Sequence, residues 1–228
     1  MAISDSLIAT QHRIAEACVT AGRAPGSVRL LVVSKTFPAT AVREAFAAGA
    51  RAFGENYVQE GLDKIAELAD LRQQIEWHLI GPLQSNKTRP VAAQFDWVHS
   101  VDRLKIAQRL SEQRPAELPP LQVCLQVNIS GEASKSGCLP ADLPDLARAV
   151  AALPRLRLRG LMAIPEPAAD PATQRLPHRA LARLLAELNA TQDLSLDILS
   201  MGMSADLEAA IAEGSTLVRV GTAIFGRR

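Results

Sequence analysis

The sequence predicts an α/β fold, a single (β/α)8 barrel of the TIM type preceded by one extra helix. Three observations support this prediction. Short apolar runs alternate about eight times with longer stretches in which apolar residues recur at helical spacing. The strand-like runs are apolar along most of their length, which indicates strands buried on both faces, as in a parallel sheet. Finally, no shift in composition and no flexible linker divides the chain, so we expect residues 1–228 to form one domain.

The elements follow one another in a regular order. A helix over 4–20 ends at Gly22, and a strand at 28–33 precedes a helix that Pro38 opens and Gly49 closes, the usual positions for these residues. The later strands are expected at 51–54, 75–80, 95–99, 121–127, 156–162, 196–199 and 216–220. The helices after them are expected at 58–68, from about 86, and at 104–110, 143–153, 178–188 and 205–212. A doubly wound open sheet is the competing architecture, since the number of strands cannot prove that a sheet closes.

Composition excludes several classes of partner. The net charge is +1, with 25 basic and 24 acidic residues spread over both halves, which gives no field suited to a nucleic acid or a membrane surface. The start of the chain has no basic and apolar leader pattern, and no stretch is long enough to span a bilayer, so we expect a cytoplasmic protein.

The cysteines indicate neither a disulfide scaffold nor a metal site. Cys18, Cys124 and Cys138 are odd in number, far apart and never in a C-x-x-C pair. Cys124 lies within an apolar run and is expected in the core, whereas Cys138 follows a glycine in a loop and is expected to be more exposed. No metal ligand set is therefore predicted.

Lys35 is the first candidate for chemistry. It follows the apolar run at 28–33, and in a parallel barrel the residues after each strand meet on one rim, where active sites lie. We expect the lysine to be half-buried there, which would favour the free amine that attacks an aldehyde. Taken alone the signal is weak, because most lysines at strand ends are simply solvated.

The loops after the seventh and eighth strands form the second candidate. Barrels often bind phosphate there through small residues, hydroxyls and backbone amides. Ser200, Gly202, Ser204, Gly221 and Thr222 supply these groups. Either loop alone could be a plain turn, but the two together, next to the strand-one lysine, favour a phosphate site.

A lysine beside a phosphate site suits an aldehyde cofactor that carries a phosphate, and pyridoxal 5′-phosphate is such a cofactor. Arg219 on the eighth strand is the candidate partner for the ring nitrogen. The alternative is that Arg219 forms a salt bridge on the barrel rim.

Six motifs in order closely resemble the pyridoxal phosphate homeostasis protein family, the single-barrel relatives of the alanine racemase N-terminal domain. The resemblance runs nearly from end to end. The motifs are VSKT at 33–36, FGENY at 53–57, HLIGPLQSNK at 78–87, VNISGEASKSG at 127–137, SMGMS at 200–204 and VRVGTAIFG at 218–226.

The resemblance implies roles for several residues of these motifs. Lys35 would hold pyridoxal 5′-phosphate as an internal aldimine, and Arg219 would face the pyridine nitrogen. Asn56 and His78 would line the face of the ring. The implied cofactor contacts are Lys35, Asn56, His78, Ser200, Met203, Arg219, Gly221 and Thr222, of which Ser200, Gly221 and Thr222 would hold the phosphate.

The resemblance also implies a carrier of the cofactor in intracellular vitamin B6 and amino-acid homeostasis, without catalytic turnover. Alanine racemases, which share the arginine, carry a further β domain and a catalytic tyrosine, whereas this sequence reaches Arg228 soon after the last strand and its one tyrosine, Tyr57, belongs to a motif. We therefore expect a monomer that binds the cofactor and passes it to apo-enzymes that depend on it. The alternative is a small amino-acid racemase with Lys35 as its acid and base. A Schiff-base aldolase is a third reading, but aldolases of that kind place the lysine on a later strand.

One loop has no assigned role. Glu132, Lys135 and Ser136 invite comparison with a phosphate-binding P-loop, but the glycine required before the lysine is absent. Nucleotide binding is not supported, and a rim loop for docking a partner is the expectation.

Overall fold

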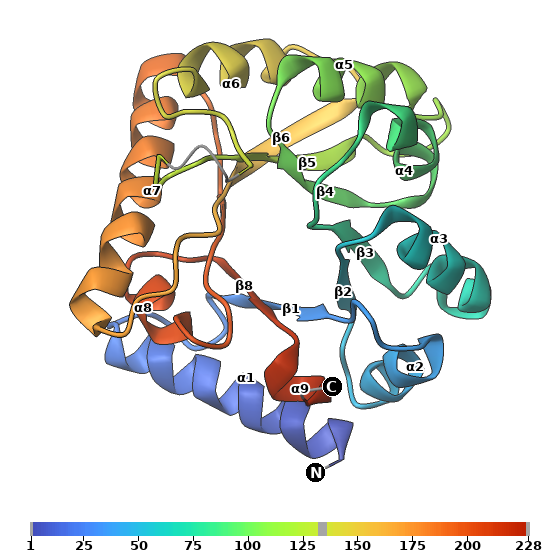
Figure 1. The fold of residues 1–228 in the computed structure, drawn as a ribbon, viewed down its shortest axis with the longest axis vertical. Coiled ribbons are helices and arrows are strands. Elements are labelled where there is room, and N and C mark those ends of the chain that lie inside the picture. The colour runs from blue at the N-terminus through green and yellow to red at the C-terminus, as the bar shows by residue number, and fades with distance from the viewer. Residues whose placement is uncertain (1, 132–135, 227–228) are drawn as a thin grey trace.

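The sheet is a closed barrel of parallel strands. The computed structural model describes residues 2–131 and 136–226. Within these ranges the strands pair in chain order, and β8 closes on β1 through the register Leu31 to Arg219 (Figure 1). The strands are β1 Arg29–Val33, β2 Ala52–Glu55, β3 Glu76–Leu79, β4 Trp97–Val101, β5 Leu121–Gln126, β6 Leu156–Met162, β7 Ile198–Ser200 and β8 Leu217–Val220. The predicted barrel is confirmed, and the open sheet is excluded.

Helices surround the barrel on its outside (Figure 1). They are α1 Ile3–Thr20, α2 Ala39–Ala47, α3 Val58–Glu67, α4 Thr88–Gln94, α5 Leu104–Gln113, α6 Leu143–Ala151, α7 Pro171–Gln192, α8 Leu207–Ala212 and α9 Thr222–Phe225, with short 3-10 turns at Ala69–Leu71 and Ser85–Lys87. The extra helix α1 packs against α2, α8 and α9, and so covers the seam where β8 meets β1. No helix within the described ranges has the length and apolarity needed to cross a membrane.

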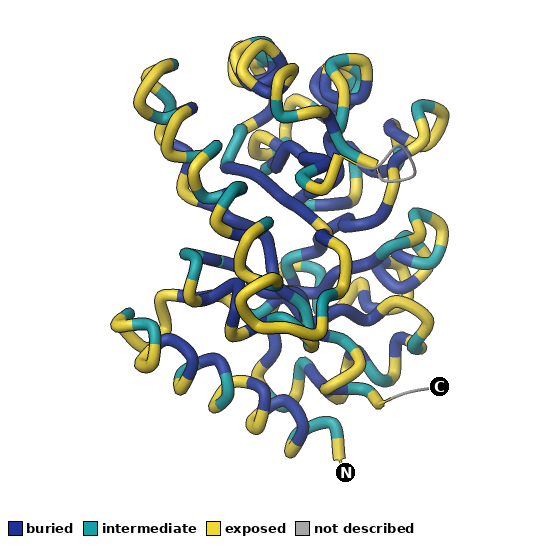
Figure 2. Tube along the Cα trace, turned by 60° about the vertical axis from the view of Figure 1, so that its left-hand side comes forward, coloured by how far each residue is buried: buried dark blue, intermediate teal, exposed yellow. Residues whose placement is uncertain are grey.

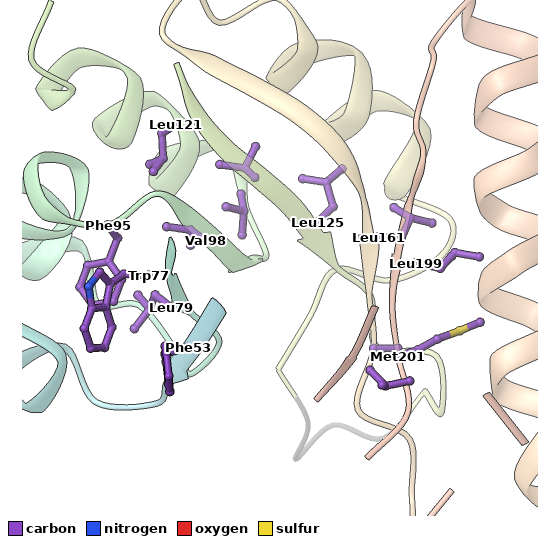
Figure 3. Close-up of a cluster of buried hydrophobic side chains, with 14 of the residues drawn as sticks. Phe53, Trp77, Leu79, Phe95, Val98, Leu121, Leu125, Leu161, Leu199 and Met201 are labelled. Atoms are coloured by element: carbon purple, nitrogen blue, oxygen red, sulfur yellow. The ribbon is translucent and has the colours of Figure 1, made fainter. Parts of the chain in front are cut away.

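Side chains alternate between two environments along each strand. Outward strand residues such as Phe53 and Trp77 pack with Phe95, which follows α4, between the strands and the helices in the main core (Figure 3). Figure 2 shows the buried strands inside a shell of helices whose outer faces are exposed. Two smaller apolar clusters are separate from the main core: Leu31, Val33, Ala52, Ile80 and Leu217, and Trp97, Cys124, Met162 and Ile198.

Helix α7 is longer than the sequence predicts. It begins at Pro171 instead of near 178, because the Asp170 side chain caps it by accepting a 2.8 Å hydrogen bond from the Thr173 amide. Pro171 occupies the first turn, where its missing N–H costs nothing. Pro177 lies inside the helix.

Cys138 is buried, contrary to the expectation from its loop position. Its backbone N–H donates to Gln126 and its carbonyl accepts from the Asn128 amide, so this short segment lies alongside the end of β5. Burial raises the pKa of the Cys138 thiol to about 11, so the thiolate is scarce at neutral pH.

Candidate active-site cavity

A cavity of 630 Å³ opens at the carboxyl ends of the strands. Six of the eight predicted site residues line it, namely Lys35, Asn56, Met203, Arg219, Gly221 and Thr222. Val33, Phe37, Ile80 and Ile164 supply apolar walls, and the other lining residues are Thr36, Ser204, Ala205 and Gly226. The structure therefore brings together residues from both ends of the chain, as the barrel topology requires.

Lys35 is exposed, which corrects the expectation that it is half-buried. Strand β1 ends at Val33, and the next residue, Ser34, is buried. The turn that follows presents the Lys35 side chain to the cavity. Thr36, the next residue, has a φ of 67°. This left-handed conformation is strained for a β-branched residue, at a cost of about 1–3 kcal/mol, so the surrounding structure must hold it.

The buried side chain of Lys64 holds this turn in place. The Lys64 ammonium donates to the Ser34 carbonyl at 2.7 Å and to the carboxylates of Glu55 at 2.8 Å and Glu60 at 2.7 Å. Glu60 in turn accepts from the Thr36 amide. Lys64 thereby fixes the backbone on both sides of Lys35, directly before it and, through Glu60, directly after it.

Close packing of α3 brings Lys64 within reach of the turn. Gly61 lies one turn before Lys64, and a Cβ at Gly61 would come within 2.6 Å of the Phe95 ring and 3.3 Å of the Glu55 side chain. The absent side chain lets the helix approach β2. The pKa of Glu55 is raised by burial, an effect that exceeds the lowering by hydrogen bonds from Lys64 and Ser34.

Arg219 lies at the floor of the cavity and is 3% exposed. Its Nη1 donates to the carbonyl and the hydroxyl of Ser200 at 2.5 and 2.8 Å, and its Nη2 donates to the Ala163 carbonyl at 2.8 Å. Burial lowers the pKa of Arg219 to about 10, which leaves the guanidinium charged at neutral pH. The alternative of a salt bridge on the rim does not describe Arg219, because within the described residues its hydrogen-bond partners are two carbonyls and a hydroxyl.

His78 and Ser200 are not among the residues that line the cavity. Both are completely buried. Ser200 bonds to Arg219 and to Nδ1 of His99 at 2.8 Å, and His78 bonds to Nε2 of His99 at 2.8 Å. Strand β4, which carries His99, is not a neighbour of β7, which carries Ser200, so these side chains meet inside the barrel.

Tight backbone packing fixes two of the lining residues. A Cβ at Gly81 would fall 2.1 Å from the Asn56 carbonyl oxygen, so the chain after β3 lies directly against Asn56. A Cβ at Gly221 would fall 2.8 Å from the Val33 carbonyl oxygen. The phosphate candidates Gly221 and Thr222 are thus held against the end of β1, one residue from the turn that begins at Ser34.

Sequence reasoning missed Lys64, Glu55 and His99. A lysine within a helix is usually solvated, and only Gly61, placed one turn earlier, hinted that this face of α3 is close-packed. The loop candidates Glu132 and Lys135 lie outside the described residues, and Ser136, which is described, is exposed.

The profile of the family described as "Alanine racemase, N-terminal domain" matches residues 6–228. The chain is similar to the "Pyridoxal phosphate homeostasis protein" of Pseudomonas aeruginosa, with 67% identity over 226 residues that cover 99% of this chain and 96% of that protein. It is 57% identical to the protein of the same name from Escherichia coli K12, over 99% of this chain and 97% of that one. Among solved structures, PipY of Synechococcus elongatus PCC7942 with PLP bound aligns with a TM-score of 0.82 and 42% identity, covering 93% of this chain and all of that one.

Proposed function

This chain belongs to the pyridoxal phosphate homeostasis protein family, and from that premise we propose that it binds pyridoxal 5′-phosphate reversibly in the cavity at the carboxyl ends of its strands. The observation that carries the proposal is the placement of an exposed amine, Lys35, in one cavity with a buried guanidinium, Arg219. When bound, the cofactor supplies an aldehyde that can condense with an amine, with loss of one water molecule.

The donor groups of the cavity fit this cofactor. Lys35 would bond to the aldehyde carbon, and Arg219, whose two Nη groups are held by barrel oxygens, would face the ring nitrogen. Ser204 and Thr222 supply hydroxyls for the phosphate, and the backbone of Gly221 lies beside them. In this proposal Ser204 takes the phosphate-binding role that was predicted for Ser200. Apolar residues of β1 and of the segment after β3 would lie against the ring.

Holding and release of the cofactor fit the cavity better than racemisation. A racemase needs a proton donor or acceptor on each face of the bound amino acid. Among the lining residues within 2–131 and 136–226, the titratable side chains are Lys35 and Arg219, while Tyr57 is 61% exposed and lies outside the lining. The proposal takes the chain as a single-domain monomer that supplies cofactor-dependent apo-enzymes.

The proposal is tested by following the visible absorption of the lysine adduct after purified protein is mixed with pyridoxal 5′-phosphate. The band should form with wild-type protein and with Lys105→Ala, a control that removes an exposed lysine of α5. It should be absent in Lys35→Ala, and borohydride reduction followed by peptide mass spectrometry should locate the adduct on Lys35. Persistence of the band in Lys35→Ala would contradict the cofactor site. Deuterium exchange at the α-carbon of amino acids that depends on Lys35 would contradict a pure carrier.

A further inference from the structure

Five side chains form a continuous hydrogen-bonded chain through the barrel interior. They are Glu76 and His78 on β3, His99 on β4, Ser200 on β7 and Arg219 on β8. Each of the four contacts is 2.8 Å long, from Arg219 Nη1 to Ser200 Oγ, to His99, to His78 and to Glu76 Oε1. The chain begins at the floor of the cofactor cavity and ends at the opposite end of the barrel, where Glu76 opens its strand.

The chemistry of the two ends, together with the neutrality of both histidines, fixes the direction of every bond. A guanidinium can only donate and a carboxylate can only accept. Glu76 therefore accepts from Nε2–H of His78, and a neutral His78 then accepts at Nδ1 from Nε2–H of His99. Nδ1 of His99 in turn accepts from the Ser200 hydroxyl, whose oxygen accepts from Arg219. One arrangement of protons satisfies all four bonds with both histidines neutral.

We propose that this chain is a positioning device for Arg219, in which His78 and His99 are held as neutral Nε2–H tautomers and Ser200 passes their orientation to the guanidinium. The proposal rests on the proposed function only in taking Arg219 as the partner of the cofactor ring nitrogen. It assigns His78 and Ser200 an indirect role in place of their predicted direct contacts, and it adds His99 and Glu76 to the site.

Burial and packing support a fixed chain. The side chains of His78, His99 and Ser200 are 0% exposed, so water does not compete for their bonds. The His78 ring stacks on Trp97 with centroids 5.2 Å apart and planes 10° apart, which restricts its rotation. Burial lowers the pKa of both histidines, and the positive charges near His99 lower its pKa further, so both rings are neutral at pH 7.

The far end of the chain is anchored by a second charge. Glu76 also accepts from Nη2 of Arg29 at 2.6 Å, and both residues line a 530 Å³ cavity at the amino ends of the strands. Burial acts to raise the pKa of Glu76, but the hydrogen bonds from His78 and Arg29 and the charge of Arg29 outweigh it and lower the pKa below its usual value. The carboxylate that terminates the chain is therefore ionised at neutral pH.

The tautomers are read by long-range proton–nitrogen NMR correlation on 15N-labelled protein without cofactor. The sequence has four histidines, so the signals of His78 and His99 can be assigned by single substitutions. In wild type both should show a protonated Nε2 and an unprotonated Nδ1 at pH 7. Ser200→Ala should change the His99 signals and weaken cofactor affinity by about tenfold or more, the expected effect of losing one hydrogen bond to a charged group.

Two matched variants separate positioning from a general loss of stability. Ser200→Thr keeps a hydroxyl at the same place and should retain the wild-type tautomers and most of the affinity. Ser215→Ala removes an equally buried hydroxyl that bonds to the Met201 carbonyl at 2.7 Å and lies outside the chain. It should lower stability but leave the histidine signals and the affinity unchanged.

The proposal is overturned if either wild-type histidine carries its proton on Nδ1 or is doubly protonated at pH 7, a measurement that requires no variant to fold. It is also overturned if Ser200→Ala binds the cofactor as wild type does, or if Ser215→Ala loses as much affinity. Failure of the proposed function is a different result, in which Lys35→Ala forms the adduct band normally while the tautomers of His78 and His99 are as expected.

Discussion

Replacing Lys64 by methionine removes the charge that holds the turn around Lys35. Methionine keeps a long unbranched side chain but cannot donate a hydrogen bond. The Lys64 side chain is 5% exposed and that of Glu55 is 0% exposed, so the variant leaves a carboxylate in the protein interior without its cation. The Oε2 atom of Glu55 already has no hydrogen-bond partner in the described part of the chain.

Breaking one side of a buried ion pair costs about 3–5 kcal/mol. We expect Lys64→Met to lose about 3 kcal/mol of unfolding free energy at pH 8, since methionine regains part of the packing. The pKa of Glu55 is already raised by burial, and removal of Lys64 raises it further. A raised carboxyl pKa contributes stability that is present at low pH and lost as the pH rises. The deficit of the variant should therefore be smaller at pH 5, where Glu55 can take up a proton, than at pH 8.

The assay is urea unfolding followed by far-UV circular dichroism at pH 5 and pH 8. Lys105→Met, which changes an exposed lysine of α5, should stay within about 0.5 kcal/mol of wild type. The double variant Lys64→Met with Glu55→Gln should recover much of the loss, because no buried charge is then left. A loss below about 1 kcal/mol, or an equal loss at the two pH values, would refute the argument that Glu55 is left as an uncompensated charge.

Two further predictions concern packing and acid stability. Gly81→Ala should lower the unfolding free energy by about 1–3 kcal/mol and weaken cofactor binding, because the new Cβ would fall 2.1 Å from the Asn56 carbonyl oxygen. An unchanged midpoint of urea unfolding would show that this backbone contact is not tight. The pKa of Glu76 is lowered, so its charge contributes stability that is complete above about pH 4.5 and is lost as the pH falls through the lowered pKa. The stability difference between wild type and Glu76→Gln, measured by urea unfolding at pH 6 and pH 3, should therefore shrink at pH 3, and a constant difference would contradict the assignment.

The barrel could be predicted because strands buried on both faces appear in the sequence as apolar runs. The fifth strand, for example, was predicted at 121–127 and lies at Leu121–Gln126, with five of its six residues buried. Helix α7 was predicted too short, at 178–188, whereas in the structure Pro171 occupies an N-terminal position and Pro177 is tolerated inside the helix. A proline in the first turn of a helix removes no backbone hydrogen bond, so it does not by itself mark the end of a helix.

The residues that line the cavity could be predicted, but the contacts of the side chains buried beneath it could not. Motif order located Lys35 and Arg219, which the structure places in one cavity. His78 and Ser200 belong to the same motifs, yet their strand positions direct them into the barrel, where they bond to His99. Ser200 meets His99 from a strand that is distant in the sequence, and no local pattern in the sequence indicates which side chains meet across a barrel.

The backbone at Thr36 has a consequence for how fast a ligand can be exchanged. Folding alone forces this residue into a left-handed conformation, with the Lys64 network holding it there. The loop that presents the Lys35 amine is therefore ordered before any aldehyde arrives, and capture requires no rearrangement of this turn. Release likewise leaves this turn in place, so the turn adds no conformational step to the exchange of the proposed ligand.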